Sequence, residues 1–187
     1  AEQWNLLQPI KSDILDKAVP ANLRHPNNLW FSFSTRARVI LRDKNKVGEK
    51  DITSYEELAD PKWQGKVLIT TSNSIYNQSL LASIVEADGS EKAEAWAKGL
   101  VANLARKPEG ADTEQCLALA AGVGEIAVSN SYYFGRLLGR DEETRKKLEH
   151  IAIVFPNQDA QGSLGRGTHI NVSGGGVAAY APNKDNA

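Results

Sequence analysis

The 187-residue chain contains no methionine, one cysteine and only three histidines. A single cysteine cannot form an internal disulfide bond, so cysteine usage leaves the redox compartment undecided. The histidines are widely separated and have no cysteine neighbours, which excludes the usual zinc-binding spacings. Because methionine is absent and the first residue is Ala1, we expect a processed mature chain or an internal fragment.

The chain also lacks an excess of charge of either sign and has no long apolar run. Its 22 Lys and Arg residues nearly balance 23 Asp and Glu residues. No broad positive field is available for nucleic acid, so we expect no nucleic-acid partner. No apolar run approaches the roughly 18 residues of a membrane span, and we therefore expect no membrane insertion. The 41% hydrophobic and 24% charged fractions are typical of a folded globular chain.

Strand-like and helix-like segments alternate along the sequence, which predicts an α/β layered sheet. Residues 30–42 have the pattern of one strand that would extend about 40 Å. This length favours a strand that crosses between two lobes. A helix that begins with the capping-box pattern Asp112-Thr-Glu-Gln115 is expected to end at Gly122. The run 173–176 is expected to form a turn, because three of its four residues are glycine.

Two segments share the order strand, Ser/Thr/Asn loop and helix start, at 68–76 and 126–133. Ligands of open α/β sheets bind beyond the carboxyl ends of strands, and helix N-termini favour anions. Each segment places tyrosine in the first helical turn: Tyr76 in one, and Tyr132 and Tyr133 in the other. Both loops therefore mark candidate binding positions, although such loops also serve as ordinary helix caps.

Three converging phenols would suit a trivalent metal ion. A phenol has a pKa of about 10 in water and is neutral, but a hard, highly charged cation can displace its proton. Three phenolate oxygens balance a charge of three, and the shortage of thiolate and thioether ligands argues against copper(I) and iron–sulfur chemistry. The tyrosine pair is equally compatible with packing or with an aromatic cleft wall.

Arginines accompany these tyrosines. Arg136 follows the tyrosine pair on the same helical face, and Arg36 and Arg38 lie on the predicted crossing strand. A buried guanidinium there would donate hydrogen bonds to phenolate oxygens or to a bound anion. The alternative is that Arg36 and Arg38 are surface cations.

Several motifs resemble a known family. Residues 55–65 resemble the lobe-entry motif of periplasmic solute-binding proteins of ABC importers. Other motifs are similar to the ferric-iron-binding proteins of this class, above all to the FutA-like subgroup; they lie at 75–79, 96–103, 120–124, 131–133 and 165–173. The resemblance covers nearly the whole chain.

This resemblance implies a fold, a ligand and a partner. The fold would be the hinge-bending type II periplasmic binding protein fold. Tyr76, Tyr132 and Tyr133 would bind Fe(III), with Arg36 and Arg136 close to the metal and a synergistic anion or water on the remaining coordination positions. The protein would be a periplasmic monomer that delivers iron to an ABC importer permease.

The chain departs from the family pattern at both ends. A Tyr/His segment that usually follows the N-terminal strand is missing, and so are the C-terminal helices of the first lobe. We therefore expect mostly one lobe with crossing strands. Residues 1–36 would be a remnant of lobe 1, residues 37–165 would form lobe 2, and residues 166–187 would return into lobe 1.

Two other functions compete with iron binding. The Ser/Thr/Asn loops at two helix starts could hold a small oxyanion such as phosphate or sulfate. An enzyme is not expected, because no Ser/His/Asp order, paired-carboxylate cleft or Walker-type loop is evident. The glycine-rich run 162–167 follows a loop rather than a strand, so it is a weak phosphate-binding candidate.

Overall fold

The computed structural model describes residues 2–158 and 165–186. The chain forms two compact units. The smaller consists of residues 1–35 and 171–187, and the larger of residues 36–170. Half of the glycine-rich run at 162–167, residues 162–164, lies outside the described residues.

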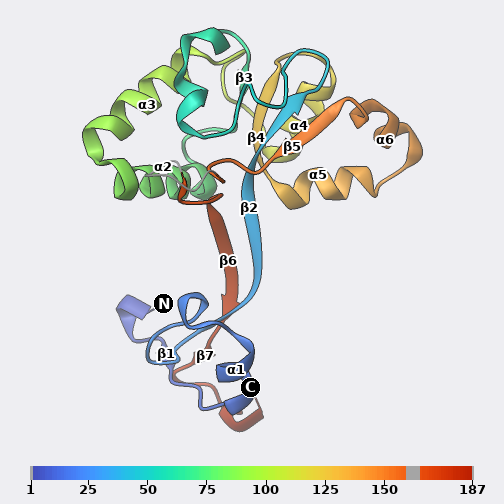
Figure 1. Cartoon of the computed structure of the whole chain (residues 1–187). Helices are drawn as coiled ribbons and strands as arrows, with labels where there is room; N and C mark the ends of the chain where they lie inside the picture. Colours follow the sequence, from blue (N-terminus) through green and yellow to red (C-terminus); the bar gives the residue numbers. More distant parts are fainter. Residues whose placement is uncertain (1, 159–164, 187) are drawn as a thin grey trace. The chain divides into compact units, whose positions relative to one another are not determined.

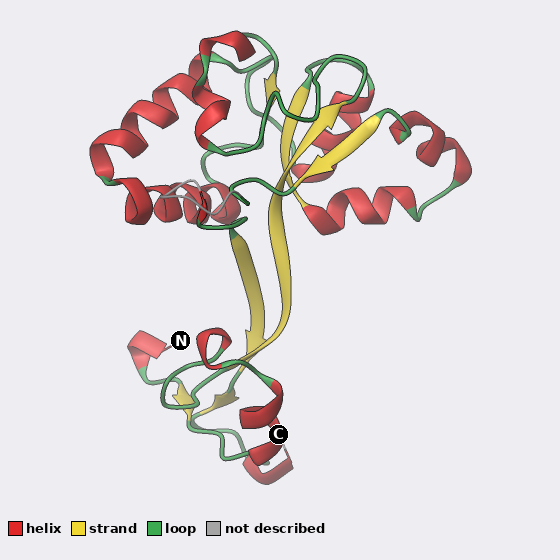
Figure 2. Cartoon of the chain, in the orientation of Figure 1, coloured by secondary structure: helices red, strands yellow, loops and turns green. Residues whose placement is uncertain are grey.

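The larger unit is built on a mixed sheet, shown in yellow in Figure 2. Its strand order is β3 (Val67–Leu68), β4 (Ile126–Asn130), β2 (Phe31–Asp43) and β5 (Ile151–Val154). Strand β3 runs parallel to β4, whereas β2 runs antiparallel to both β4 and β5. The strand predicted at 30–42 is confirmed as the 13-residue β2, which contributes residues to both units.

Alternating side chains of these strands enter two separate hydrophobic cores. Ile40 of β2 and Val128 of β4 pack into one core, and their neighbours Leu41 and Ala127 pack into the other. Successive side chains of a strand point to opposite faces, so continuously apolar strands mean that both faces of the sheet are covered. This explains why the strands read as unbroken apolar runs.

Helices cover each face of the sheet in the larger unit (Figure 1). Helices α2 (Ile75–Asp88) and α3 (Ser90–Ala102) pack on the first core. The second core is covered by α4 (Asp112–Ala120), α5 (Ser131–Leu138) and α6 (Glu142–Leu148). Two short 3-10 helices, η3 (Glu56–Ala59) and η4 (Pro61–Trp63), precede β3. No helix among the described residues has the length and apolar character needed to span a bilayer.

The smaller unit contains short elements. Strand β1 (Leu7–Gln8) pairs antiparallel with β7 (Val177–Ala178). Its helices are η1 (Glu2–Trp4), α1 (Asp13–Ala18), η2 (Ala21–Leu23) and η6 (Lys184–Asn186). Ser12 caps α1, because its hydroxyl accepts a hydrogen bond from the Leu15 amide.

The turn expected at 173–176 is wrong for most of this run. Strand β6 spans Ile170–Gly175 and pairs with β2. A Cβ atom at Gly174 would lie 2.3 Å from the carbonyl oxygen of Phe31. Glycine is needed there because two backbones approach closely, and not because the chain reverses direction.

Candidate metal centre

The two tyrosine-bearing helices begin at the same edge of the sheet. Helix α2 follows β3, and α5 directly follows β4. These strands are parallel neighbours, with Leu68 opposite Ala127. Because the carboxyl ends of parallel strands meet at one edge, Tyr76 near the start of α2 lies close to Tyr132 and Tyr133 near the start of α5.

The structure brings the three predicted tyrosines together. The ring centroids of Tyr132 and Tyr133 are 4.1 Å apart, with the ring planes tilted by 30°. Burial raises the pKa of Tyr132, and hydrogen bonding to the side chains of Tyr133 and Tyr76 raises that pKa further. Tyr132 therefore interacts with both other phenols, and the three side chains form one cluster, called the tyrosine cluster below.

Cationic side chains lie over one ring of the tyrosine cluster. The Cζ atom of Arg36 is 5.5 Å from the centroid of the Tyr76 ring, and that of Arg38 is 5.9 Å away. Both distances are within the range of a cation–π interaction. Arg136 is exposed on α5, and within the described residues no ion pair, hydrogen bond or ring contact joins it to the cluster. The structure thus places Arg36 and Arg38, but not Arg136, against a tyrosine.

The alternative of Arg38 as a surface cation is wrong, because its side chain is completely buried. It forms an ion pair with Asp112 through Nη1. The same nitrogen donates to Asn130 Oδ1 at 3.3 Å, and Nη2 donates to Asn77 Oδ1 at 2.6 Å. An apolar strand can hold a guanidinium only when acceptors surround it, since an unpaired buried charge is costly.

Asp112 does not cap helix α4, in contrast to the expected capping box. The N-cap is Ala111, whose amide donates to the Glu114 carboxylate at 2.8 Å. The carboxylate of Asp112 is buried instead, where it pairs with Arg38 and accepts a hydrogen bond from the backbone N–H group of Asn130 at 2.8 Å. The capping pattern is shifted by one residue because this ion pair occupies the aspartate.

Sequence reasoning missed Asn77 and Asn130 as parts of this site. The Asn77 side chain donates to the carbonyl oxygens of Thr70 and Thr71 at 2.8 Å and 3.0 Å, and so holds the loop that precedes α2. Asn130 is the N-cap residue of α5. One signal was available, because each asparagine lies within two residues of a predicted tyrosine ligand.

A cavity of about 310 Å³ opens beside the tyrosine cluster. Tyr76 and Tyr133 line it together with hydroxyl-bearing residues of the loop before α2 and the first residues of α4; the loop residues are Thr70, Thr71 and Ser74. Among the residues that the structure describes, no group of three or more histidine, cysteine, aspartate or glutamate side chains is arranged to hold a metal ion. The phenol oxygens are the candidate donors here.

Known proteins resemble the chain in sequence and in fold. Residues 1–161 match the family described as bacterial extracellular solute-binding protein. The whole chain is 49% identical to iron uptake protein A1 of Synechocystis sp. and covers 51% of that relative. The chain spans about half the length of the curated relatives that it matches.

Two solved structures are similar over 98% of this chain, each with a TM-score of 0.90. One is Trichodesmium IdiA (FutA) in complex with iron and citrate ligands, at 51% identity and 57% coverage of that chain. The other is apo FutA2 from Synechocystis PCC6803, at 45% identity and 58% coverage. The expected fold class is confirmed: the chain has the α/β fold of type II periplasmic binding proteins, mostly as one lobe. By sequence and by fold, then, the chain belongs to the family of bacterial extracellular solute-binding proteins.

Proposed function

We propose that the tyrosine cluster binds ferric iron, with the phenolate oxygens of Tyr76, Tyr132 and Tyr133 as ligands. The observation that carries this proposal is the meeting of the three phenols at one place: the rings of Tyr132 and Tyr133 are 4.1 Å apart, and Tyr133 and Tyr76 line the same cavity. Three phenols gathered in this way can supply three oxygen atoms to one small cation. A hard trivalent ion displaces their protons and is neutralised by the three resulting charges.

The arginines support the charged form of the cluster. The guanidinium groups of Arg36 and Arg38 lie near the Tyr76 ring. Once a metal ion has displaced the proton, these guanidinium groups would attract the negative charge of the bound phenolate. Three protein ligands leave coordination positions for a synergistic anion or water, and the adjacent cavity provides space for either. We also propose that Arg136 lies close to the metal ion in the loaded site.

The named relatives support iron as the cargo. One is an iron uptake protein, and one similar structure contains iron and citrate. We extend this to transport: in the intact protein the site collects iron in the periplasm and delivers it to the permease of an ABC importer. Proteins of this family bind solutes, and we propose no catalytic step.

A ferric titration tests the proposal. Adding ferric citrate to the purified chain should produce the visible absorbance of a phenolate-to-iron charge-transfer transition. Replacing Tyr132 and Tyr133 together by Phe should abolish this absorbance. Tyr180→Phe is the matched control, because the Tyr180 side chain is 93% exposed and belongs to the smaller unit. A folded chain that stays colourless would contradict the proposal.

Binding of a small oxyanion is the second candidate, favoured by the hydroxyl groups around the cavity. Asp112 also lines this cavity, and its carboxylate would repel an oxyanion that binds there without a metal ion. Calorimetry with phosphate in the absence of iron separates the two functions. Heat of binding that persists in the Tyr132→Phe, Tyr133→Phe double variant would favour the oxyanion.

A further inference from the structure

One buried guanidinium connects the two helix starts that carry the tyrosine cluster. Arg38 is wholly buried in β2 and directly opposite Asn130 in the pairing with β4. Its Nη2 atom reaches Asn77, the residue after Tyr76, and its Nη1 atom reaches Asn130, two residues before Tyr132. The two asparagines come from chain segments 53 residues apart in sequence, which have no covalent reason to keep a fixed spacing.

Two of the side chains that Arg38 contacts, Asn77 and Asp112, also form hydrogen bonds with backbone groups. Asn77 holds the carbonyl oxygens of Thr70 and Thr71 through its Nδ2 atom. Asp112, the ion-pair partner of Arg38, accepts a hydrogen bond from the backbone N–H group of Asn130, the N-cap residue of α5. The guanidinium therefore acts on the position of both helices, while it also lies 5.9 Å from the centroid of the Tyr76 ring.

We propose that Arg38 is a positioning residue for iron binding, which sets the spacing of Tyr76 from Tyr132 and Tyr133 through Asn77, Asn130 and Asp112. This inference rests on the proposed function. Arginine suits the role because its planar fork serves several acceptors at fixed angles, whereas the ammonium group of lysine is a single point charge. Partners behind metal ligands commonly change metal affinity by about 10- to 100-fold when they are removed.

The first experiment measures iron binding in matched variants. Asn77→Ala removes the link to α2 and leaves the Arg38–Asp112 ion pair in place. Gln78→Ala is the control, because this exposed neighbour also donates to the loop before α2, at Ser72, but has no hydrogen bond to Arg38. We expect Asn77→Ala to weaken iron binding by about 10-fold or more and Gln78→Ala to leave it unchanged.

Absorbance per bound iron separates positioning from loss of folded protein. Unfolding reduces the amount of iron bound, but it does not change the charge-transfer absorbance of each loaded site. If Tyr76 is displaced, that absorbance should fall in Asn77→Ala toward the value of Tyr76→Phe. The Arg38→Lys variant should show the same fall, and adding Asn77→Ala to it should cost less than Asn77→Ala alone, because the contact between Arg38 and Asn77 is then already weakened. Unchanged absorbance in both single variants, or fully additive losses of affinity, would overturn the proposal.

A second measurement requires no metal. Labelling the apo chain with 3-fluorotyrosine gives one fluorine resonance for each of its five tyrosines, and Tyr76→Phe identifies that of Tyr76. Asn77→Ala and Arg38→Lys should shift or broaden the Tyr76 resonance, whereas Gln78→Ala should not. An unchanged Tyr76 resonance in both would refute positioning by Arg38. Failure of the wild-type chain to bind iron would instead refute the proposed function, and the fluorine spectra would still decide the role of Arg38.

Discussion

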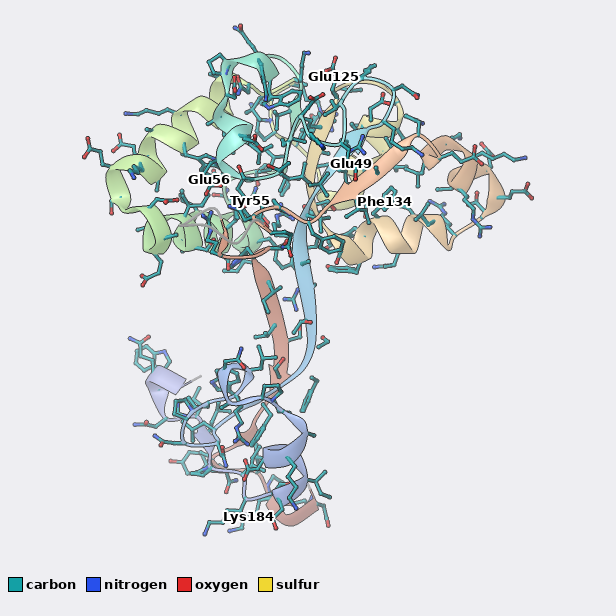
Figure 3. The ribbon with its side chains drawn as sticks, in the orientation of Figure 1. Glu49, Tyr55, Glu56, Glu125, Phe134 and Lys184 are labelled. Carbon is teal, nitrogen blue, oxygen red and sulfur yellow. The ribbon has the colours of Figure 1, made fainter. Side chains whose placement is uncertain are left out.

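The hydroxyl group of Tyr55 donates a hydrogen bond to the backbone carbonyl oxygen of Arg38. The Tyr55 hydroxyl oxygen in turn accepts a hydrogen bond from the backbone amide of His169 at 3.1 Å. Tyr55 is completely buried, and Figure 3 shows it in the larger unit, next to Glu56. One phenol therefore joins the backbone of β2 to the segment that leads into β6, and it does so beside the residue that connects the two tyrosine-bearing helices.

Removing this hydroxyl should destabilise the chain. Tyr55→Phe leaves the Arg38 carbonyl and the His169 amide without the partner that they share. Leaving buried polar groups unpaired costs about 1–3 kcal/mol, so the free energy of unfolding should fall by that amount. Urea denaturation measures the loss, with the exposed Tyr180→Phe as control. Equal stabilities of the two variants would show that this hydrogen bond contributes nothing.

The ion pair of Arg38 and Asp112 should behave as one unit. Arg38→Met leaves a carboxylate that is 2% exposed without its cation. Breaking a buried pair in this way typically costs about 3–5 kcal/mol. Adding Asp112→Asn removes the stranded charge and should restore part of the stability. Urea denaturation of the two single variants and the double variant measures the coupling, and a double variant that is less stable than Arg38→Met would disprove it.

Iron binding should release protons and weaken in acid. Burial and the neighbouring hydroxyls of Tyr133 and Tyr76 raise the pKa of Tyr132, so this phenol carries its proton in the metal-free site near neutral pH. A metal ion must displace that proton, and proton competition becomes stronger as the pH falls. Titration of the unbuffered chain with a ferric complex in a pH-stat counts the protons released. Tyr132→Phe should release fewer, and an equal count in the two proteins would contradict the assignment of Tyr132 as a ligand.

His169 should make the stability depend on pH. Burial lowers its pKa in the folded chain, and the charges of Arg38 and Arg166 lower it further. The unfolded chain therefore binds a proton more readily, and protonation favours unfolding. The contribution of His169 is fully present above its unfolded pKa of about 6.5 and is lost as the pH falls toward the lower folded value.

Urea midpoints at pH 7.5 and at pH 5.5 test this dependence. His169→Gln should reduce the difference between the two midpoints, because its side chain does not titrate. The Nε2 atom of His169 lies 2.8 Å from the Ser79 hydroxyl, so Ser79→Ala is a control for loss of that contact alone. A pH dependence that is the same in His169→Gln and in the unmodified chain would assign it to other groups.

The order of elements and the place of each tyrosine at a helix start could be predicted from the sequence, because both depend on local pattern. Helix α2 begins and ends where apolar spacing and Asp88-Gly89 indicate, and Tyr76 falls in its first turn. The parallel pairing of β3 with β4 then brings Tyr76 to Tyr132. That pairing connects residues nearly 60 positions apart, and no local pattern specifies it.

The polar network around Arg38 could not be predicted in the same way. A burial state depends on which acceptors the fold brings to a side chain, and Asp112 is 74 residues away in the sequence. The sequence from Asp112 to Gln115 also fits a capping box, and capping a helix is a local and more common role for aspartate. Gly174 shows the same limit, since the close approach of Phe31 that requires glycine is a contact between distant strands.

All three tyrosines lie within residues 36–170, a single compact unit. Their relative spacing is thus established when that unit folds, and the entropy of gathering the donors is lost then, before any ion arrives. An incoming ion would meet a preorganised set of oxygens. We expect the speed of loading to depend mainly on how fast the ion exchanges the chelator that it carries, such as citrate, for these phenols.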